Sequence, residues 1–430
     1  MPDDIHARLR RLRKAGRKRR RPLPRGPEAR QEEPAPTPVK PPAPARDARE
    51  PAVDLAHLPG MEERESAWGR YLLRTRRFPL THTQGRVSLG EVLGLEEDAV
   101  RMLTETREFD FRRAVFLDTE TSGLAGGAGT IVFLTGVGVF EGDAYVVRQY
   151  FARNPAEERA YLPDLARFLA EREGLVTFNG RAFDWPLLRS RFILTGVAPP
   201  QAEPHLDLLI PARRLWRPRL GACNFGHLEE RILGHERSGL DIPSWRIPSL
   251  WFRFARGEGS VQEMEAVLYH NQEDIVSMAP LAHVMAATLA GLHDPHPHDW
   301  LALARINARA GRFDRAERAY LQALDAPLPP ALRVRAMREL AALLKREGRR
   351  AEAVVWWRAL AEMQPADIDA LVELAKYYEW EAKDIAKARA VTEEAIRRAE
   401  TWRSPGERAQ ALEMLAHRLA RLRRKSSPTP

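Results

Sequence analysis

An apolar run that ends in two acidic residues places the strongest constraint on this chain. Residues 114–121 read Ala-Val-Phe-Leu-Asp-Thr-Glu-Thr, so Asp118 and Glu120 follow a β-prone segment. Side chains at positions i and i+2 of a strand point to the same face. Two carboxylates on one face repel each other, and a divalent cation between them would offset that repulsion. Oxygen-only ligation suits Mg²⁺ or Mn²⁺. Taken alone, the pattern more often marks a solvated strand end than a metal site.

The composition indicates a globular protein of two or three domains. The chain has 430 residues, of which 44% are hydrophobic and 30% are charged. It contains no run of 18 apolar residues and no secretory signal pattern, which predicts that it does not enter a membrane. Cys223 is the single cysteine, so an internal disulfide and a multi-cysteine metal site are excluded. A reducing, cytoplasmic location is expected.

The net charge of +9 is concentrated near the N-terminus. Residues 1–50 hold 15 Lys/Arg and 7 Asp/Glu, or +8, so the remaining 380 residues sum to about +1. Together with the run of Pro and Ala from residue 34, this predicts a disordered basic tail over residues 1–55. Such a tail can neutralise nucleic-acid phosphates or simply aid solubility. No lysine lies between Lys40 and Lys345, which excludes a catalytic lysine and a P-loop in that stretch.

The order of the predicted elements indicates the fold of residues 56–296. Strand-like runs occupy 114–118, 131–140 and 144–152, and Gly142-Asp143 is a hairpin signal between the last two. A helix, a strand at 175–178, a helix at about 183–195 and a strand-like segment at 205–208 follow. Three strands in succession and then helical crossovers predict an α/β ribonuclease-H-like domain with a mixed sheet.

From Trp300 the chain is all-helical and repetitive. Aligning Gly311 with Gly348 gives a period of 37 residues, and four further pairs then match: Ala304/Ala341, Ala316/Ala353, Tyr320/Trp357 and Ala323/Leu360. Small residues and an aromatic at these places resemble tetratricopeptide repeats. We therefore expect tetratricopeptide-like helical repeats over 297–425, able to bind a protein partner. An unrelated bundle of helical hairpins is the alternative.

Two further acidic residues stand at informative positions. Asp184 follows Phe178-Asn179-Gly180 and falls in the first turn of a predicted helix, where a carboxylate could simply complement the helix dipole. Asp274 lies inside a predicted amphipathic helix, where an acidic residue normally faces solvent. Asp207, between two leucines, is another candidate at a strand end.

Together these carboxylates resemble the DEDD 3′–5′ exonuclease superfamily. Asp118 and Glu120 match its first motif, Asp184 the second and Asp274 the third. The sequence around Asn179 and after Asn224 is similar to the ribonuclease-H-like branch typified by bacterial YprB proteins. That branch also carries helical repeats after the nuclease domain. The resemblance implies a 3′–5′ exonuclease that cleaves single-stranded DNA or RNA with two Mg²⁺ or Mn²⁺ ions held by the four carboxylates. The matching motif also suggests that Asn179 contacts substrate, although capping of the strand–helix turn explains it equally. Arg181 begins a basic helix face that either contacts the nucleic-acid backbone or is simply solvated.

The third motif departs from the family pattern. The superfamily places tyrosine four residues, or histidine five residues, before the last aspartate; here His270 is at minus four and Tyr269 at minus five. His270 is the preferred base because residues i and i+4 share a helix face, with Tyr269 as the alternative, and a third interpretation gives neither a role in proton transfer. The functional alternative is a weak or inactive nucleic-acid-binding adaptor that recruits a protein through its repeats.

Overall fold

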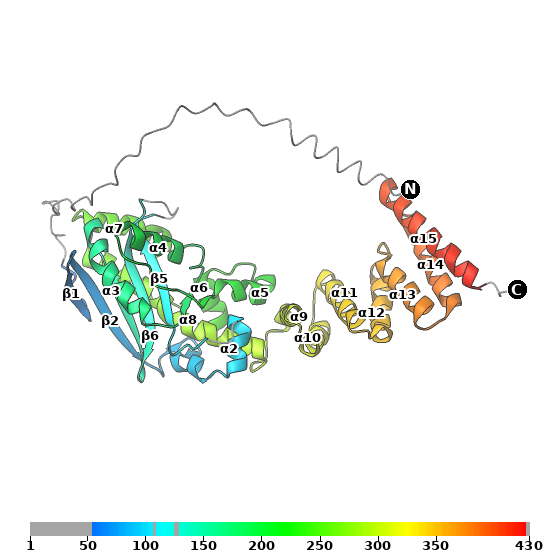
Figure 1. Ribbon diagram of the computed structural model, residues 1–430, viewed down its shortest axis with the longest axis horizontal. Coiled ribbons are helices and arrows are strands. Elements are labelled where there is room, and N and C mark those ends of the chain that lie inside the picture. Colours follow the sequence, from blue (N-terminus) through cyan, green and yellow to red (C-terminus); the bar gives the residue numbers. More distant parts are fainter. Residues whose placement is uncertain (1–53, 106–108, 124–128, 427–430) are drawn as a thin grey trace, which may run out of the picture. The chain divides into compact units, whose positions relative to one another are not determined.

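A seven-stranded mixed sheet organises the first half of the protein (Figure 1). A computed structural model describes residues 54–105, 109–123 and 129–426, so the predicted tail lies outside the described residues up to position 53. The strand order in the large sheet is β1-β2-β7-β6-β5-β8-β9, and β3 and β4 pair separately. The strands are β1 (Met61–Ser66), β2 (Gly69–Pro79), β3 (Thr83–Gln84), β4 (Val87–Ser88), β5 (Val115–Thr121), β6 (Val132–Glu141), β7 (Ala144–Phe151), β8 (Leu175–Thr177) and β9 (His205–Asp207).

The predicted meander and crossovers are confirmed. Strands β5, β6 and β7 pair antiparallel in succession, and Gly142-Asp143 forms the turn between the last two. Strands β8 and β9 run parallel to β5, as strands joined by helical crossovers do. The hairpin β1–β2, which extends the sheet beyond β7, was not predicted. Its strands alternate charged and apolar residues so irregularly that they carry no clear strand signal.

Helices cover both faces of this sheet. They are α2 (Glu97–Thr104), α3 (Glu158–Ala170), α4 (Asp184–Leu194), α5 (Leu209–Leu220), α6 (Phe225–Leu228), α7 (Ile247–Ala255) and α8 (Val261–Ala290), with short turns η1 (Leu89–Gly94), η2 (Pro155–Glu157), η3 (Glu229–Leu233), η4 (Ser244–Arg246) and η5 (Pro297–Asp299). Along β5, Val115 and Leu117 pack in one core with α3, α4 and α7, whereas Phe116 packs in the other with α2, α5 and the second half of α8. This alternation fixes which face each carboxylate of β5 occupies.

Two glycines in β6 let α8 lie against the sheet. A Cβ at Gly136 would stand 2.2 Å from Oδ1 of Asn271, and one at Gly138 would stand 2.6 Å from the Ile275 side chain. Both contacts are far inside van der Waals distance, so any larger residue would push the helix away. The close approach brings buried polar residues of α8 within reach of the end of β5.

The remaining helices form consecutive hairpins. They are α9 (Trp300–Arg309), α10 (Phe313–Asp325), α11 (Pro330–Arg346), α12 (Arg350–Met363), α13 (Asp369–Trp380), α14 (Ile385–Glu400) and α15 (Pro405–Ser426). Gly311 and Gly348 end α9 and α11 with φ of 73° and 79°, a left-handed conformation that glycine adopts without strain. All eight side chains of the four further aligned pairs are buried. The 37-residue period thus corresponds to a repeated helical hairpin.

Contacts join the first helical hairpin to the sheet domain. Helix α9 packs on α5, and the Arg219 guanidinium donates two hydrogen bonds to Asp299 at 2.8 and 2.9 Å. None of the helices in residues 54–426 is long and apolar enough to cross a bilayer. The boundaries near residues 55 and 296 stay predictions.

A buried carboxylate ties the last helix to the third hairpin. The Glu379 side chain is fully buried and accepts hydrogen bonds from Arg421 at 2.7 Å, Lys425 at 2.8 Å and Arg418 at 3.4 Å. Burial alone would raise its pKa, but these cations outweigh burial and lower it to about 2. The carboxylate therefore stabilises the packing of α15 on α13 at neutral pH.

Glu379→Gln should destabilise the helical region by about 2–4 kcal/mol at pH 7, because it removes a buried charge that three cations face. The pKa of Glu379 is lowered on folding, so its contribution is present above the ordinary value of 4.5 and is lost as the pH falls to about 2. The gap between wild type and variant should close over that range in thermal unfolding followed by circular dichroism. Glu394→Gln is the matched control, since Glu394 also binds two arginines but keeps 36% of its side-chain surface exposed. An equal loss in both variants would contradict this account.

Candidate active site

Asp118 lies near the end of β5 on the face covered by α8. Its Oδ2 accepts a 2.9 Å hydrogen bond from Nδ2 of Asn271, and Oδ1 of Asn271 accepts one of 2.9 Å from Gln149. The buried amide chain Gln149–Asn271 thus fixes the carboxylate from behind. Burial and the negative charges of Asp274, Asp184 and Glu120 raise the pKa of Asp118 well above its usual value.

Glu120, two residues further along β5, points to the same face. Its Oε1 lies 4.0 Å from Nε2 of His270. Burial raises its pKa to about 8, opposed by the charge of His270 and supported by the charges of Asp274 and Asp184. For both carboxylates of β5, burial is the largest cause of the raised pKa, and repulsion from Asp274 and Asp184 adds to it.

Asp184 reaches the site from α4. It is the first residue of that helix, as expected from the sequence, and its Oδ1 accepts a 2.5 Å hydrogen bond from Oγ1 of Thr119. Thr119 stands between Asp118 and Glu120 and belongs to the opposite face of β5. Burial raises the pKa of Asp184 to about 6, although the hydrogen bond from Thr119 acts in the other direction.

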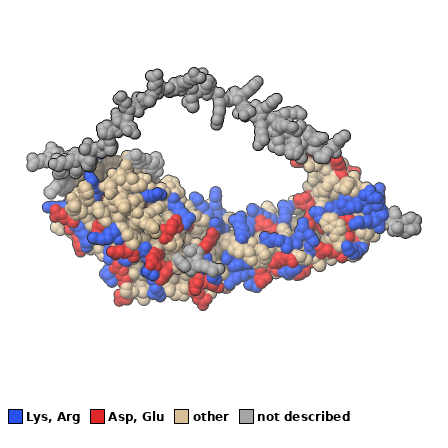
Figure 2. All heavy atoms as spheres, viewed as in Figure 1, with Lys and Arg blue, Asp and Glu red and all other residues tan. Residues whose placement is uncertain are grey.

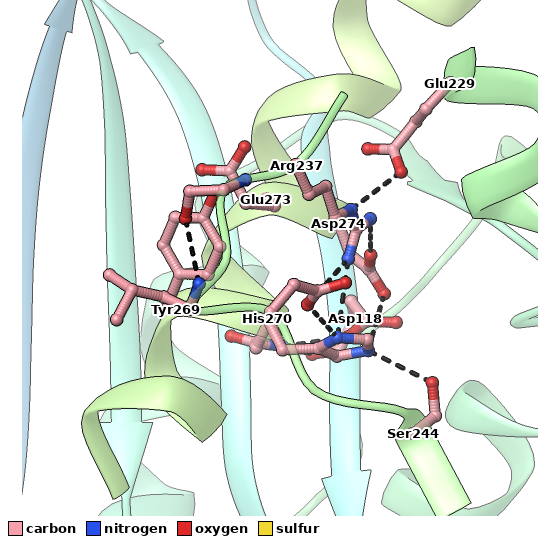
Figure 3. Close-up of polar contacts among 12 residues, drawn as sticks. Asp118, Glu229, Arg237, Ser244, Tyr269, His270, Glu273 and Asp274 are labelled. Atoms are coloured by element: carbon pink, nitrogen blue, oxygen red, sulfur yellow. Dashed lines mark hydrogen bonds and ion pairs between the residues drawn. The ribbon is translucent and has the colours of Figure 1, made fainter. Parts of the chain in front are cut away.

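Asp274 is not the solvent-facing residue that its position within a helix would suggest, because α8 is buried along most of its length. Its Oδ1 accepts a hydrogen bond from the Arg237 guanidinium, which also donates to Glu229 over 2.7 Å. Its Oδ2 lies 3.8 Å from Nε2 of His270. Figure 3 shows Arg237 and His270 on two sides of this carboxylate.

His270 is held from both ring nitrogens. Nδ1 lies 2.7 Å from Oδ1 of Asp241, and Nε2 lies 3.2 Å from Oγ of Ser244. Burial alone would lower its pKa, but Asp274, the hydrogen bond to Asp241 and Glu120 together raise it to about 9. In this arrangement the imidazole is protonated at neutral pH, so it can accept a proton only after the neighbouring negative charge has been offset.

Tyr269 points away from the carboxylates (Figure 3). Its hydroxyl accepts a 3.1 Å hydrogen bond from the backbone N–H of Ser238. Consecutive residues of a helix are 100° apart, so His270 and Tyr269 cannot both face Asp274. The geometry places His270, not Tyr269, beside the carboxylates.

The turn after β8 is organised by Asp207. Its carboxylate accepts hydrogen bonds from the backbone N–H groups of Asn179, at 2.7 Å, and Arg181, at 3.1 Å. Asn179 has a φ of 67°, a conformation that asparagine tolerates better than most residues. The Arg181 guanidinium donates to the backbone carbonyl of His205. Asp207 therefore positions the segment that leads to Asp184, and the side chain of Arg181 is engaged within the protein.

A cavity of about 540 Å³ opens beside His270 and Asp274. Its other walls come from the start of α6 and from the segment 235–244, which supplies Arg237, Asp241 and Ser244. Sequence reasoning missed these three residues and Asn271. Residues 235–243 form neither a helix nor a strand, so no periodic pattern marks Arg237 or Asp241. For Asn271 one signal was available in the sequence, its position three residues before Asp274.

The donor set fits hard divalent cations in its chemistry. Four buried or half-buried carboxylates supply oxygen ligands, and the raised pKa values show a charge that a cation would offset. Within residues 54–105, 109–123 and 129–426, however, no three His, Cys, Asp or Glu side chains are gathered closely enough to hold an ion as they stand. The Arg237 guanidinium is hydrogen-bonded to Oδ1 of Asp274. This oxygen would have to release the guanidinium before it could bind a metal ion.

Comparison with known proteins gives the family. Residues 115–286 match the model of the RNase H superfamily, and this range runs from the start of β5 into the last turns of α8 and includes all four carboxylates. The uncharacterized protein YprB of Bacillus subtilis (strain 168) is 32% identical over 368 residues, which are 83% of this chain and 86% of YprB. The chain thus belongs to the same family as YprB, and its first half contains a nuclease-type domain of the RNase H superfamily.

Proposed function

We propose that the protein is a metal-dependent 3′–5′ exonuclease that hydrolyses single-stranded nucleic acid at Asp118, Glu120, Asp184 and Asp274. The observation that carries the proposal is the burial of neighbouring carboxylates: burial is the largest cause of the raised pKa values of Asp118, Glu120 and Asp184, and the charges of Asp274 and Asp184 add to the rise at Asp118 and Glu120. Repulsion between neighbouring carboxylates does not stabilise the folded protein. Binding two Mg²⁺ or Mn²⁺ ions accounts for it.

The metal pair, when bound, would supply an activated water and stabilise the leaving oxygen. The protein groups then have distinct tasks. Asn271 and Thr119 orient Asp118 and Asp184 through hydrogen bonds. Asp241 fixes His270 through Nδ1, which leaves Nε2 directed at Glu120 and Asp274. Because offsetting those two charges lowers the pKa of His270 from about 9, the imidazole becomes able to take a proton from water near neutral pH.

Substrate contacts follow from the same layout. The cavity beside His270 is large enough for a nucleotide. Asn179, whose backbone N–H is held by Asp207, lies five residues before Asp184 and contacts substrate in this proposal. Arg181 contacts substrate in this proposal once it leaves the carbonyl of His205. We also propose that the helical hairpins are tetratricopeptide-like repeats, because the residues that the 37-residue period aligns are buried between the helices.

The alternative function is a nucleic-acid-binding adaptor with little or no catalytic activity. The contact between Arg237 and Asp274 favours it, because a guanidinium there offsets charge without a metal. The inverted order of Tyr269 and His270 also departs from active relatives of the exonuclease superfamily.

Release of nucleotides from labelled strands decides between the two functions. The full chain is incubated with single-stranded DNA or RNA carrying a label at the 3′ or the 5′ end, with Mg²⁺, Mn²⁺ or EDTA. The exonuclease should release a labelled mononucleotide at once from the 3′-labelled strand and shorten the 5′-labelled strand stepwise, in either metal but not in EDTA. Internal fragments from a circular strand would show endonuclease action instead, and no product under any condition would leave only the adaptor.

A further inference from the structure

The charge of the chain is divided between its two halves. The sum of about +1 over residues 51–430 conceals two opposite contributions. Residues 51–296 hold 27 Lys/Arg and 33 Asp/Glu, a net charge of −6. Residues 297–426 hold 26 Lys/Arg and 19 Asp/Glu, a net charge of +7. All five lysines after Lys40 lie between residues 345 and 425. A nuclease-type domain of negative charge repels a polyanion, whereas the helical region attracts one.

Cations from several helices meet around α13. Glu373 is bound by Lys345 and Lys376, each at 2.7 Å, and Glu381, directly after α13, by Arg350 at 2.8 Å. Glu379 is bound by three cations from α15. Six cations thus face three carboxylates, and the most heavily paired carboxylate is fully buried while its partners Arg421 and Lys425 keep 31% and 45% of their side-chain surface exposed. The solvent therefore meets the cations rather than the anion.

The last two turns of α15 extend this basic surface. From residue 418 to residue 426 the helix has five basic residues and no acidic one, and Arg423 and Arg424 are exposed. Figure 2 shows Lys and Arg side chains gathered over this end of the helical region. Such a density of positive charge on one surface is the electrostatic pattern of a phosphate-backbone contact.

An exposed aromatic side chain lies within the same surface. Trp380, the last residue of α13, is 46% exposed, and the guanidinium carbons of Arg418 and Arg421 lie 5.9 and 6.0 Å from its ring centroid. Aromatic rings between cations serve as stacking platforms for unpaired bases. A partner that is an acidic protein would use the cations but would have no specific need of the ring.

We propose that the surface formed by Trp380, Arg421, Arg424 and Lys425 binds single-stranded nucleic acid, apart from the carboxylate site. Phosphates would lie on the cations of α15, and a base would stack on Trp380. This gives the helical region a nucleic-acid partner in place of the protein partner expected from its repeats. The inference goes beyond the proposed nuclease activity, since it concerns binding alone.

Binding of the full chain to labelled single-stranded DNA and RNA oligonucleotides in EDTA tests the proposal, because cleavage cannot occur without metal. R424Q/K425Q should weaken binding roughly tenfold at low salt and reduce the slope of log K against log salt by about 1.4, the value for two lost phosphate contacts on a single strand. W380A should weaken binding about 5- to 100-fold, the range for loss of one base stack.

Matched controls separate this surface from general charge. R113Q/R167Q removes two exposed arginines from the sheet domain, and W68A removes a tryptophan that is also 46% exposed and also stacked by an arginine; neither should change binding more than twofold. Equal losses in test and control variants, unchanged binding by the test variants, or no binding by the wild type would each overturn the proposal. If the test variants lose binding and the wild type has no nuclease activity in any metal, the binding surface is supported and the proposed nuclease function is contradicted.

Discussion

Replacing Asp118 by asparagine should abolish metal-dependent cleavage, with a loss of at least roughly 10³-fold in rate. Asparagine keeps the shape of the side chain and can still accept the hydrogen bond from Asn271. It removes one negative charge from a set whose combined charge is needed to hold divalent ions. The measurement is the initial rate of nucleotide release from a 3′-labelled strand in Mn²⁺ at saturating protein.

The same substitution should not unfold the protein, and this makes the result interpretable. The pKa of Asp118 is raised on folding, so the metal-free wild type loses stability as the pH rises above the ordinary value of 3.8. The variant lacks that cost and should be at least as stable in EDTA at pH 7–8. Asp143→Asn in the exposed β6–β7 turn is the control. A variant of Asp118 within tenfold of the wild-type rate would show that the site is assigned wrongly.

His270→Gln should lower the rate of cleavage by about 10²–10³-fold, because Nε2 of His270 is the basic group directed at the carboxylates. Tyr269→Phe, which removes a hydroxyl bound to the backbone of Ser238, should change the rate less than twofold. These paired variants answer the question that the inverted Tyr-His order leaves open. Equal losses would mean that neither side chain transfers the proton and that both support the packing of α8.

The stability of the His270→Gln variant should depend on pH because His270 carries a positive charge. Its pKa is raised to about 9 in the metal-free protein, so its contribution to stability is complete below the ordinary value of 6.5 and is lost as the pH rises through 9. In EDTA, His270→Gln should therefore be most destabilising at acidic pH and nearly neutral above pH 9. Titration of the imidazole by NMR should show its pKa falling when Mg²⁺ is added.

The periodic parts of the sequence predicted their own structure well. The runs around Phe116, Phe133 and Val146 became β5, β6 and β7 because buried strands need continuous apolar residues. The alignment of Gly311 with Gly348 found the helical repeat because each turn needs a residue with positive φ. The third hairpin shows the limit: its turn uses Lys383 at φ 55°, so no glycine marks it. The edge strand β1 and its neighbour β2 were missed because both are partly exposed and carry charged residues.

By itself, the sequence predicted one set of carboxylates, Asp118, Glu120, Asp184 and Asp274, from their strand-end and helix positions and their order along the chain. Only the tertiary structure decided what surrounds them. Arg237 contacts Asp274, Asp241 contacts His270 and Asn271 contacts Asp118, across separations of 37, 29 and 153 residues. No local pattern encodes such contacts. Gly136 permits the approach of Asn271, and the rotation of α8 selects His270 over Tyr269. Local spacing fixes which groups are available, whereas packing fixes their partners, their burial and thus their charge.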